Sequence, residues 1–442
     1  MSDLASLYAN HLATICRHAD AALAAAHCDT LAIAAGRPLP KFQDDQDFAY
    51  VAHPCFKYWL PVTHAPGSWL LYTPGKKPRV LYMQPRDYWH AVPEAPSGYW
   101  VDHVDVVPVH SIEDLAAELP TDATRCAIIG QPQDAVGAFV PNNPEPTLNH
   151  LAYHRAWKTP YEQELMREAN RIGTRAHRAA RDAFNAGQSE FGIHMAFLAA
   201  AVLTEPELPY GSIVALNEHG ATLHYQEFDR TAPAQHRSLL IDAGATHAGY
   251  ASDITRTYAS PAAGEFQALI DGMEANQKQL RERVVPGQDY RELHLEAHRL
   301  VAELLIAQDF LHMSADEAVA SHVTSTFFPH GLGHLIGANV HDVAGFQASP
   351  EGGRIEQPEG HPFLRLTRTL SPGMITTIEP GVYFSPMLLD ELKAKPEGKH
   401  VNWAKVDHFR QYGGIRIEDN VLCTNGAPEN LTRDAFAAQP RT

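Results

Sequence analysis

Hydrophobic residues at the start of the chain recur at helical spacing. Leu4, Leu7, Leu12 and Ile15 fall on one face and predict an amphipathic helix. Short runs rich in branched and aromatic residues then predict four strands: TLAIAAG (30–36), SWLLYTP (68–74), RVLYMQP (79–85) and RCAIIG (125–130). Between the last two, SIED (111–114) has the capping-box pattern that opens a short helix. Strands mixed with helices predict a small α/β domain.

A change of composition near residue 150 predicts a domain boundary. The segment VPNNPEPTLN (140–149) is rich in Pro and Asn and is typical of a linker. In KTPYE (158–162), Thr159 can cap a helix, Pro160 suits its first position and Glu162 can reach back to the cap. We therefore predict an N-terminal mixed α/β domain over residues 1–157 and a second domain over 158–442. Two stretches of that second domain, 351–362 and 393–400, have the Gly, Pro and charge content of exposed loop insertions.

Composition narrows the classes of partner. The 442 residues carry a net charge of −17, which argues against a nucleic-acid or anionic-membrane partner. The five cysteines form no CxxC pair, a pattern that favours free thiols in a reducing compartment. The N-terminal residues show neither a signal-peptide pattern nor a membrane span, so we expect a cytoplasmic protein.

The segment IDAGATHAGYASDITRTY (241–258) places two aspartates among small and apolar residues. Asp242 and Asp253 are an odd number of positions apart, so a hairpin with a turn at His247–Ala248 would make them direct cross-strand partners. Two buried carboxylates on direct cross-strand partners repel each other unless a cation lies between them. The spacing indicates a metal site. Taken alone, the segment also fits a turn residue at Asp242 and a solvent-facing side chain at Asp253.

Further candidate ligands follow in three more segments. FFPHGLGHLIG (327–337) carries His330 and His334, whose spacing lets both converge, and its glycines permit a close approach to the backbone. Glu379 ends an apolar run in TTIEPGVYF (376–384), and Arg416 and Glu418 share one face of GGIRIEDNVLC (413–423). Taken singly, these residues also fit a glycine-rich turn, a strand end and a surface pair. Together, four carboxylates and one imidazole suit two divalent ions that share bridging carboxylates.

The ordered set IDAGATHAGYASDITRTY, HGLGH, IEPG and RIED resembles the metal-dependent "pita-bread" peptidases, which include methionine aminopeptidase, aminopeptidase P and prolidase. PYGSIVALNEHGATLHYQ, STFFPHGLGH and GHPFLRLTR are similar to the bacterial Xaa-Pro dipeptidases, a subfamily that includes the organophosphorus acid anhydrolases. The resemblance covers nearly the whole chain. It implies an α+β protein with a small mixed α/β N-terminal domain. A pseudo-twofold pita-bread catalytic domain would follow, with a six-stranded curved sheet covered by helices, and the chain would form a homodimer.

The resemblance also implies roles for individual residues. Asp242 would bind one metal ion, His334 and Glu379 the other, and Asp253 and Glu418 would bridge the two, with Mn²⁺ first and Co²⁺ or Zn²⁺ as alternatives. Glu379 would shuttle a proton. The substrate pocket would comprise His224, His330, His341, Arg416, Tyr210, Tyr290, Val340 and Leu364, the first two histidines and the arginine also serving catalysis. Core packing is an equal interpretation for Tyr210, Tyr290, Val340 and Leu364. Asp45 and Trp89 would reach a pocket across the subunit interface.

The function implied is an Xaa-Pro dipeptidase, in which a hydroxide activated by two metals cleaves the imide bond before a C-terminal proline. The two insertions would restrict substrate length. The alternatives are an aminopeptidase P-like enzyme that accepts longer Xaa-Pro peptides, and a catalytically inactive pita-bread binding protein. The same ligand set also suits organophosphate triesters and fluorophosphates as a side activity.

Overall fold

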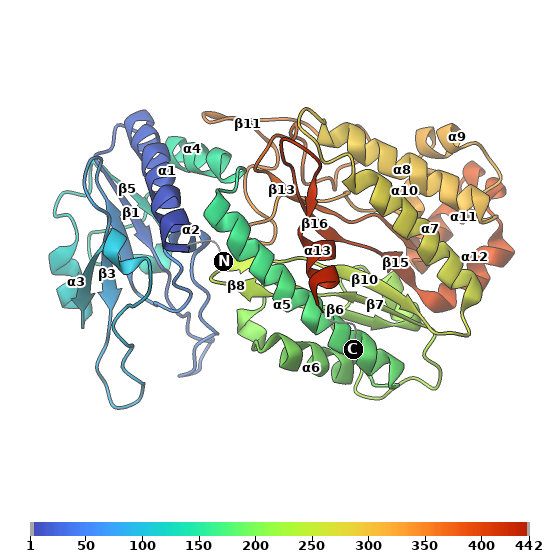
Figure 1. The fold of residues 1–442 in the computed structure, drawn as a ribbon, viewed down its shortest axis with the longest axis horizontal. Helices are drawn as coiled ribbons and strands as arrows, with labels where there is room; N and C mark the ends of the chain where they lie inside the picture. Colours follow the sequence, from blue (N-terminus) through green and yellow to red (C-terminus); the bar gives the residue numbers. More distant parts are fainter. Residues whose placement is uncertain (1–3, 440–442) are drawn as a thin grey trace. The chain divides into compact units, whose positions relative to one another are not determined.

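The structure is a computed structural model that describes residues 4–439, and these residues form two compact units (Figure 1). The first unit contains the described residues up to Leu165 together with Ala248–Tyr250 and Gln347–Gly353. The second contains Met166–His247, Ala251–Phe346 and the described residues from Arg354 onward. The predicted domains over residues 1–157 and 158–442 stay a prediction.

The first unit is built on a mixed five-stranded sheet of order β4-β3-β2-β1-β5. β1 and β5 are parallel, as are β3 and β4, and the remaining neighbours are antiparallel. Figure 1 shows helices on both sides of this sheet, with α1 on one side and α3 on the other. The elements are β1 (Thr30–Ala34), β2 (Trp69–Tyr72), β3 (Arg79–Met83), β4 (Asp105–Val109), β5 (Cys126–Ile129), α1 (Leu4–Ala25), α2 (Pro54–Trp59), α3 (Ile112–Glu118) and α4 (Glu145–Arg155), with 3₁₀ turns at Val101–His103 and Pro132–Asp134.

The first helix and the four strands predicted in this unit are confirmed, and two features differ from expectation. β4 was not predicted because its sequence DVVPV contains Pro108, which a strand tolerates only at a sheet edge, where β4 lies. The expected linker 140–149 is half helix, since α4 begins at Glu145 directly after Pro144. A proline at a helix start is compatible with the helix, so the Pro content of this stretch misled the prediction.

The chain from residue 160 onward contains nine more α-helices among the described residues. They are α5 (Pro160–Asn185), α6 (Glu190–Ala201), α7 (Gly264–Arg281), α8 (Tyr290–Ala307), α9 (Ala315–Ala320), α10 (Val323–Phe327), α11 (Pro386–Lys393), α12 (Trp403–Phe409) and α13 (Leu431–Ala438), with 3₁₀ turns at Glu205–Glu207, Asn217–Ala221, Pro396–His400 and Arg410–Tyr412. The strands are β6 (Ile213–Leu216), β7 (Ser238–Asp242), β8 (Thr246–His247), β9 (Tyr250–Ala251), β10 (Thr255–Ala259), β11 (Gln347–Ser349), β12 (Gly352–Arg354), β13 (Ile375–Ile378), β14 (Gly381–Tyr383), β15 (Gly414–Arg416), β16 (Asp419–Leu422) and β17 (Glu429–Asn430).

The predicted start of α5 is confirmed. The backbone N–H of Thr159 donates to Glu162 Oε2 at 2.8 Å, and the N–H of Glu162 lies 3.4 Å from Thr159 Oγ1. These two contacts satisfy donors that a helix start otherwise leaves unpaired.

The second unit holds its strands between two pairs of helices. Figure 1 shows α5 and α6 on one side of the strands and α7 and α8 on the other. The strands form two antiparallel three-stranded sheets, β10-β7-β6 and β13-β16-β17, and the pair β14-β15. The expected single six-stranded sheet is therefore divided. The backbone N–H of Glu418 donates to Thr255 O at 3.1 Å and joins β10 to the segment between β15 and β16. This junction brings several candidate ligands to one place.

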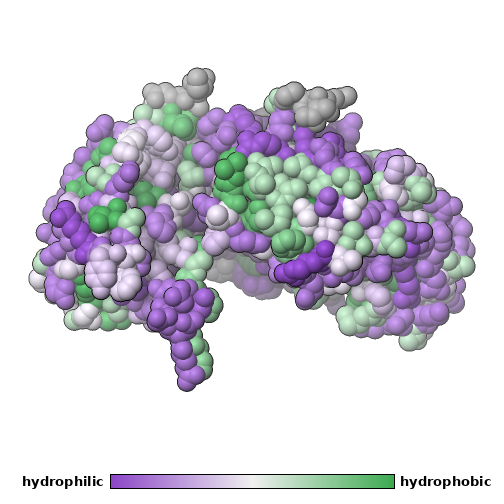
Figure 2. All heavy atoms as spheres, turned by 90° about the horizontal axis from the view of Figure 1, so that it is seen from below, coloured by the Kyte–Doolittle hydropathy of each residue, from purple (hydrophilic) through white to green (hydrophobic). Residues whose placement is uncertain are grey.

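The surface is mostly hydrophilic on the face shown in Figure 2, with hydrophobic residues gathered in a few places. The most exposed large hydrophobic side chains are Phe42, Tyr88, Val202 and Trp89. Within the described part of the chain, none of the helices has the length and apolar character needed to cross a bilayer.

Candidate functional site

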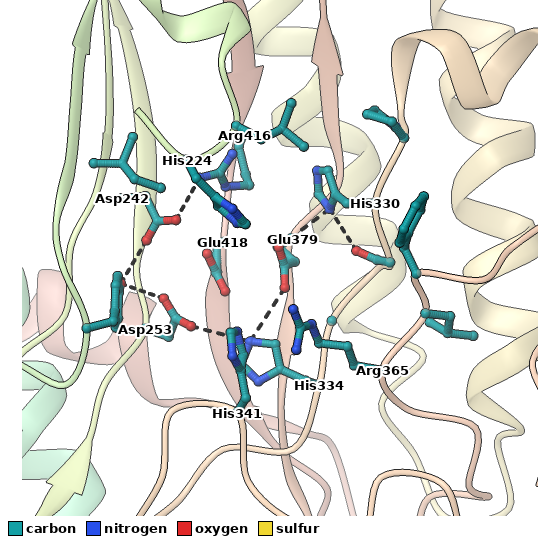
Figure 3. Close-up of a pocket in the computed structure, with 18 of the residues that line it drawn as sticks. His224, Asp242, Asp253, His330, His334, His341, Arg365, Glu379, Arg416 and Glu418 are labelled. Carbon is teal, nitrogen blue, oxygen red and sulfur yellow. Dashed lines mark hydrogen bonds and ion pairs between the residues drawn. The ribbon is translucent and has the colours of Figure 1, made fainter. Parts of the chain in front are cut away.

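The second unit contains a pocket of about 1050 Å³, and the candidate ligands face into it. Figure 3 shows their side chains pointing toward one another from strands and loops that are far apart in the sequence. The structure brings together Asp242, Asp253, His334, Glu379 and Glu418 in the lining of this pocket. All five were candidates from the sequence.

The two aspartates share a face, but their register differs from the prediction. Asp242 at the end of β7 pairs with Thr255 rather than with Asp253. The turn residues with positive φ are Ala248 and Gly249, one position later than the predicted turn at His247–Ala248. The hairpin tightens where glycine accepts a positive φ most readily, and this shifts the register. Asp253 thus lies diagonally from Asp242, still on the same side of the hairpin.

The pairing of charges behind the site fixes the direction of Glu418. The next residue, Asp419, is fully buried on the opposite face, where Arg256 and Arg433 donate to it at 2.7 and 2.8 Å. Gln277 and Asn430 also donate to Asp419, at 2.8 and 2.9 Å. Because successive residues of an extended chain point to opposite sides, this buried network turns the Glu418 carboxylate into the pocket.

Two glycines let the histidine segment pack closely, Gly333 against β13, which precedes Glu379, and Gly331 against the backbone at Leu364. A Cβ on Gly333 would come 2.2 Å from Thr377 O, and one on Gly331 would come 2.8 Å from the backbone of Leu364. The segment is neither helix nor strand, and the backbone N–H of Thr377 donates to His334 O at 3.0 Å. The expectation of a close backbone approach at these glycines is confirmed.

The imidazole of His334 is oriented for metal binding. Its Nδ1 donates to Leu335 O at 3.0 Å, so Nε2 is the nitrogen that would bind a metal ion in place of a proton. Nε2 lies 3.3 Å from Asp253 Oδ2 and 3.6 Å from Glu379 Oε1. One donor atom each from Asp253, His334 and Glu418 lie within 4.8 Å of one another. The side chains of Asp253, His334 and Glu418 therefore fit a divalent ion.

The electrostatics of the five candidate ligands, which together form the pocket floor, also favour a bound cation. Burial, with the charges of Asp253 and Glu379, raises the pKa of Glu418 well above its usual range. Burial raises the pKa of Glu379 to about 7 and also raises that of Asp242, although Arg416 opposes both shifts. Glu418 Oε1 is buried and has no hydrogen-bond partner. Such crowding of buried carboxylates is costly in the absence of a bound cation.

Burial acts on Asp253 too, but His334 decides the outcome. Burial alone would raise the pKa of Asp253, and the hydrogen bond and charge of His334 outweigh it, so that the pKa is lowered. Asp253 is therefore the carboxylate of this group that ionises most readily.

Tyr210 and Arg416 hold the two aspartates. The Tyr210 hydroxyl lies 2.7 Å from Asp242 Oδ1 and 2.5 Å from Asp253 Oδ1. The Arg416 guanidinium donates to Asp242 Oδ2 at 2.6 Å and to the Tyr383 hydroxyl at 2.5 Å. The Arg416 guanidinium is thus bonded within the pocket, where it partly compensates the negative charge of the carboxylates.

His330 stands on the opposite side of Glu379 from His334. Its Nδ1 donates to Gly331 O and its Nε2 lies 2.9 Å from the Tyr383 hydroxyl. Burial, reinforced by the charge of Arg416, lowers the pKa of His330 to about 3. His330 is neutral at neutral pH, with Nδ1 3.6 Å from Glu379 Oε2.

Most of the other predicted pocket residues also line it: His224, His341, Val340 and Leu364. Burial and the charge of His334 lower the pKa of His341 to about 4. Tyr290 is the exception, because its side chain is fully buried in the core and its hydroxyl donates to Thr377 O at 2.7 Å. It supports the backbone beside Glu379 from behind. Asp45 and Trp89 are exposed residues of the first unit, and their predicted role stays a prediction.

Sequence reasoning missed two pocket arginines, Arg354 and Arg365. Arg365 lines the pocket beside Leu364, and its guanidinium forms no hydrogen bond or ion pair with any residue from 4 to 439 (Figure 3). Arg365 lies in GHPFLRLTR, one of the segments that carry the family resemblance, and the alternation of Leu364, Arg365 and Leu366 was the available signal.

The two expected insertions differ in their relation to the pocket. Arg354, Gln357 and Pro362 contribute to its lining, so the first stretch forms part of one wall. The second stretch, 393–400, ends α11 and forms a 3₁₀ turn, and it contributes none of the lining residues. The wall at 354–365 is therefore the part that can limit substrate length.

Comparisons with known proteins match both parts of the chain. Residues 6–153 match the family model of the Xaa-Pro dipeptidase N-terminal domain, and residues 164–425 match metallopeptidase family M24. The chain is 55% identical to an Xaa-Pro dipeptidase of Xanthomonas euvesicatoria pv. vesicatoria (strain 85-10), covering 98% of this chain and 99% of the relative. It is 54% identical to an Xaa-Pro dipeptidase of Stenotrophomonas maltophilia (strain K279a), covering 99% and 98%.

Solved structures share the fold at low sequence identity. Aminopeptidase P from E. coli with the inhibitor Pro-Leu has a TM-score of 0.71 at 22% identity, covering 95% of this chain and 94% of that one. The Pseudomonas aeruginosa aminopeptidase PepP has a TM-score of 0.70 at 23% identity, covering 98% of both chains. The fold, the carboxylate-rich pocket and the full-length relatives lead to one conclusion: the chain belongs to metallopeptidase family M24, in the branch whose N-terminal domain is that of the Xaa-Pro dipeptidases.

Proposed function

We propose that this protein is an Xaa-Pro dipeptidase, or prolidase, that hydrolyses the imide bond of dipeptides with a C-terminal proline. The observation that carries the proposal is the similarity to Xaa-Pro dipeptidases over nearly the full length of both chains. The pocket supports it through a carboxylate-rich floor and an arginine-bearing wall.

The pocket floor is the proposed site of two divalent ions. Asp242 would bind one ion, His334 and Glu379 the other, and Asp253 and Glu418 would be shared. Four carboxylates with one imidazole favour Mn²⁺, with Co²⁺ or Zn²⁺ as alternatives. When bound, such a pair of ions supplies Lewis acidity and an activated water at neutral pH.

Residues of the chain would position the substrate and transfer a proton to the leaving nitrogen. Glu379, a proposed ligand with a second carboxylate oxygen to offer, is suited to accept a proton and return it to the leaving proline nitrogen. His224 and His341 offer donors to the substrate backbone at the pocket wall, and neutral His330 is held in the lining by Gly331 O and the Tyr383 hydroxyl. Arg416 holds Asp242 in place and limits the repulsion among the carboxylates.

The free carboxylate of a C-terminal proline needs a cation, and Arg365 is the proposed partner. Its guanidinium has no partner among the described residues and lies in the wall beside Leu364. An arginine can bind a carboxylate through two parallel hydrogen bonds. A longer Xaa-Pro peptide has no charge at this point, so the pairing favours dipeptides.

Two alternative functions can be distinguished from a dipeptidase by experiment. An aminopeptidase P-like activity has a fold similarity in its favour, at sequence identities below 25%. An inactive binding protein is disfavoured by the complete set of ligand types in one pocket. Hydrolysis of organophosphate triesters as a side activity can be measured in the same assay. We further propose a cytoplasmic homodimer.

The test is a paired hydrolysis assay on the chelated protein with Mn²⁺ added back. We expect metal-dependent cleavage of Ala-Pro and little cleavage of Ala-Pro-Ala. Equal cleavage of both peptides would favour the aminopeptidase, and cleavage of neither under Mn²⁺, Co²⁺ or Zn²⁺ would overturn the proposal. A neutral phosphotriester under the same conditions reports the side activity.

The same assay tests Arg365 through the variant Arg365→Met. Losing a charge-assisted pair should lower kcat/KM for Ala-Pro on the order of tenfold to 100-fold. The amide Ala-Pro-NH₂, which lacks the carboxylate, should be much less affected. Arg354→Met is the matched control, because Arg354 is also a pocket-lining arginine but bonds to Gln357 and stacks on Phe346. Equal losses on both substrates would exclude a carboxylate contact.

A further inference from the structure

Three histidines are buried together outside the carboxylate floor. His294 and His298 lie one turn apart on α8, and His361 comes from the segment that continues into the pocket wall. Their exposed fractions are 1%, 1% and 7%. Phe328 covers the group, with its ring centroid 4.8 Å from that of His298.

The three imidazoles converge on one point. One ring nitrogen of each lies within 4.8 Å of one ring nitrogen of each of the others. His294 Nε2 and His361 Nδ1 are 3.0 Å apart. Zinc–nitrogen bonds of about 2.0–2.1 Å require nitrogens roughly 3.3 Å apart in a tetrahedral site, so the arrangement needs only a modest contraction.

Two nitrogens of this group are buried without partners. His294 Nδ1 and His298 Nε2 have no hydrogen-bond partner. A buried polar atom left unpaired costs free energy, and it calls for a ligand or another explanation. His298 Nδ1 lies 2.9 Å from Thr324 Oγ1, and donation to this hydroxyl leaves the lone pair on Nε2.

The charge state of the cluster suits a metal ion. Burial, with the neighbouring histidines, lowers the pKa of His294 well below its usual range and that of His298 to about 3, and the pKa of His361 is also lowered. The ionisable groups acting on them are other histidines, including His322 and His330. The three rings are neutral at pH 7, which is the form that binds transition metals.

We propose that His294, His298 and His361 bind one further transition-metal ion, separate from the carboxylate floor. An all-imidazole site prefers Zn²⁺, Co²⁺ or Ni²⁺ over Mn²⁺, whereas carboxylates suit Mn²⁺. The ion would fasten His361, and with it the wall residues Phe363, Leu364 and Arg365, to α8. It is therefore a structural clip for the wall that limits the substrate.

The test is zinc stoichiometry of the full chain, read by mass spectrometry after chelation and dialysis against Zn²⁺. The background variant Asp253→Asn with Glu418→Gln removes two floor carboxylates. We expect this background to retain one tightly bound zinc per chain, and to lose it when His298→Gln or His361→Gln is added. His312→Gln is the matched control, since His312 is an exposed histidine paired with Asp309. A background that binds no zinc, or binding that survives both histidine changes, would overturn the proposal.

A second measurement tests the proposal without the background variant, in case Asp253→Asn with Glu418→Gln does not fold. The otherwise unchanged chain should bind three zinc ions under saturation, and His361→Gln, a change in a loop, should bind two. Equal stoichiometry in these two proteins would also overturn the proposal. Co²⁺ replaces Zn²⁺ in a parallel titration, where His361→Gln should remove a visible absorption band of the chain. These readouts do not depend on peptide hydrolysis, so a failure on Ala-Pro leaves them intact.

Discussion

At the scale of single residues, the site is an arrangement of like charges held close by their neighbours. Tyr210 bridges the two aspartates, Arg416 pairs with Asp242, and Thr255 donates to Glu418 Oε2 at 2.7 Å. These contacts position the carboxylates without neutralising all of them. The carboxylates are therefore preorganised for cations in the metal-free protein.

The raised pKa of Glu379 predicts how the stability of the metal-free protein depends on pH. The folded state holds this proton up to a pKa of about 7, whereas the ordinary value is 4.5. The resulting stabilisation is fully present below pH 4.5 and is lost as the pH rises through 7, with a limiting slope of about 1.4 kcal/mol per pH unit.

Thermal unfolding of the chelated protein between pH 4.5 and 8 measures this effect. The difference in free energy of unfolding between the chain and Glu379→Gln should shrink, and then change sign, as the pH rises. Taking the difference cancels the groups that both proteins share. A difference that does not vary with pH would show that Glu379 titrates normally in the folded state.

Residue types were the most predictable part of the site. Asp242, Asp253, His334, Glu379 and Glu418 could all be chosen because each interrupts an apolar segment with a charged or imidazole group. Register and direction were less accessible: the turn at Ala248–Gly249 and the core position of Tyr290 depend on backbone geometry and packing. Arg365 was missed because the alternation of Leu364, Arg365 and Leu366 is a weak signal that does not say whether the arginine faces a pocket or the solvent.

At the scale of elements, glycines decide how closely the histidine segment approaches β13. In Gly333→Ala the new methyl group would meet Thr377 O at 2.2 Å and the Tyr290 hydroxyl at 2.4 Å. Neither atom is the end of a flexible chain, so the segment has to move, and His334 moves with it. Overpacking of this kind costs about 1–3 kcal/mol.

We therefore expect Gly333→Ala to fold with a lower midpoint of thermal unfolding and to lose much of its metal content and activity. Gly264→Ala is the matched control, because nothing lies within 4 Å of a Cβ at that position. Metal analysis beside calorimetry separates the two effects. Unchanged metal occupancy in Gly333→Ala would show that His334 tolerates the shift.

Elements with a clear local signal were predicted well. The start of α5 carries its own capping residues, and the strands of the first unit have uniform apolar runs. β4 was not predicted, since Pro108 interrupts its apolar run, and α4 was missed because its proline-rich start was assigned to a linker; an edge strand and a helix start both accommodate proline. The division of the expected six-stranded sheet depends on tertiary contacts, which a linear pattern does not contain.

At the scale of the whole molecule, the first unit exposes aromatic residues in two loops. Phe42 is 90% exposed, Tyr88 87% and Trp89 76%. Exposed aromatic residues of this kind are typical of protein–protein interfaces. They are the part of the first unit on which the proposed homodimer can be tested.

The double variant Phe42→Asp with Trp89→Asp should shift the protein from dimer to monomer in sedimentation velocity, because it places charges in the apolar interface. Val202→Asp in the second unit, at a residue that is 79% exposed, is the control and should leave the mass unchanged. A protein that sediments identically with and without the double change does not use these loops to dimerise.

The buried network around Asp419 also has a consequence for folding. Arg256, Gln277 and Arg433 come from β10, α7 and α13, so they span most of the second unit. Until these three elements have packed together, Asp419 lacks a principal partner and Glu418 is not held toward the pocket. The carboxylate set should therefore assemble cooperatively with the second unit, and it should be lost as a whole when that unit unfolds.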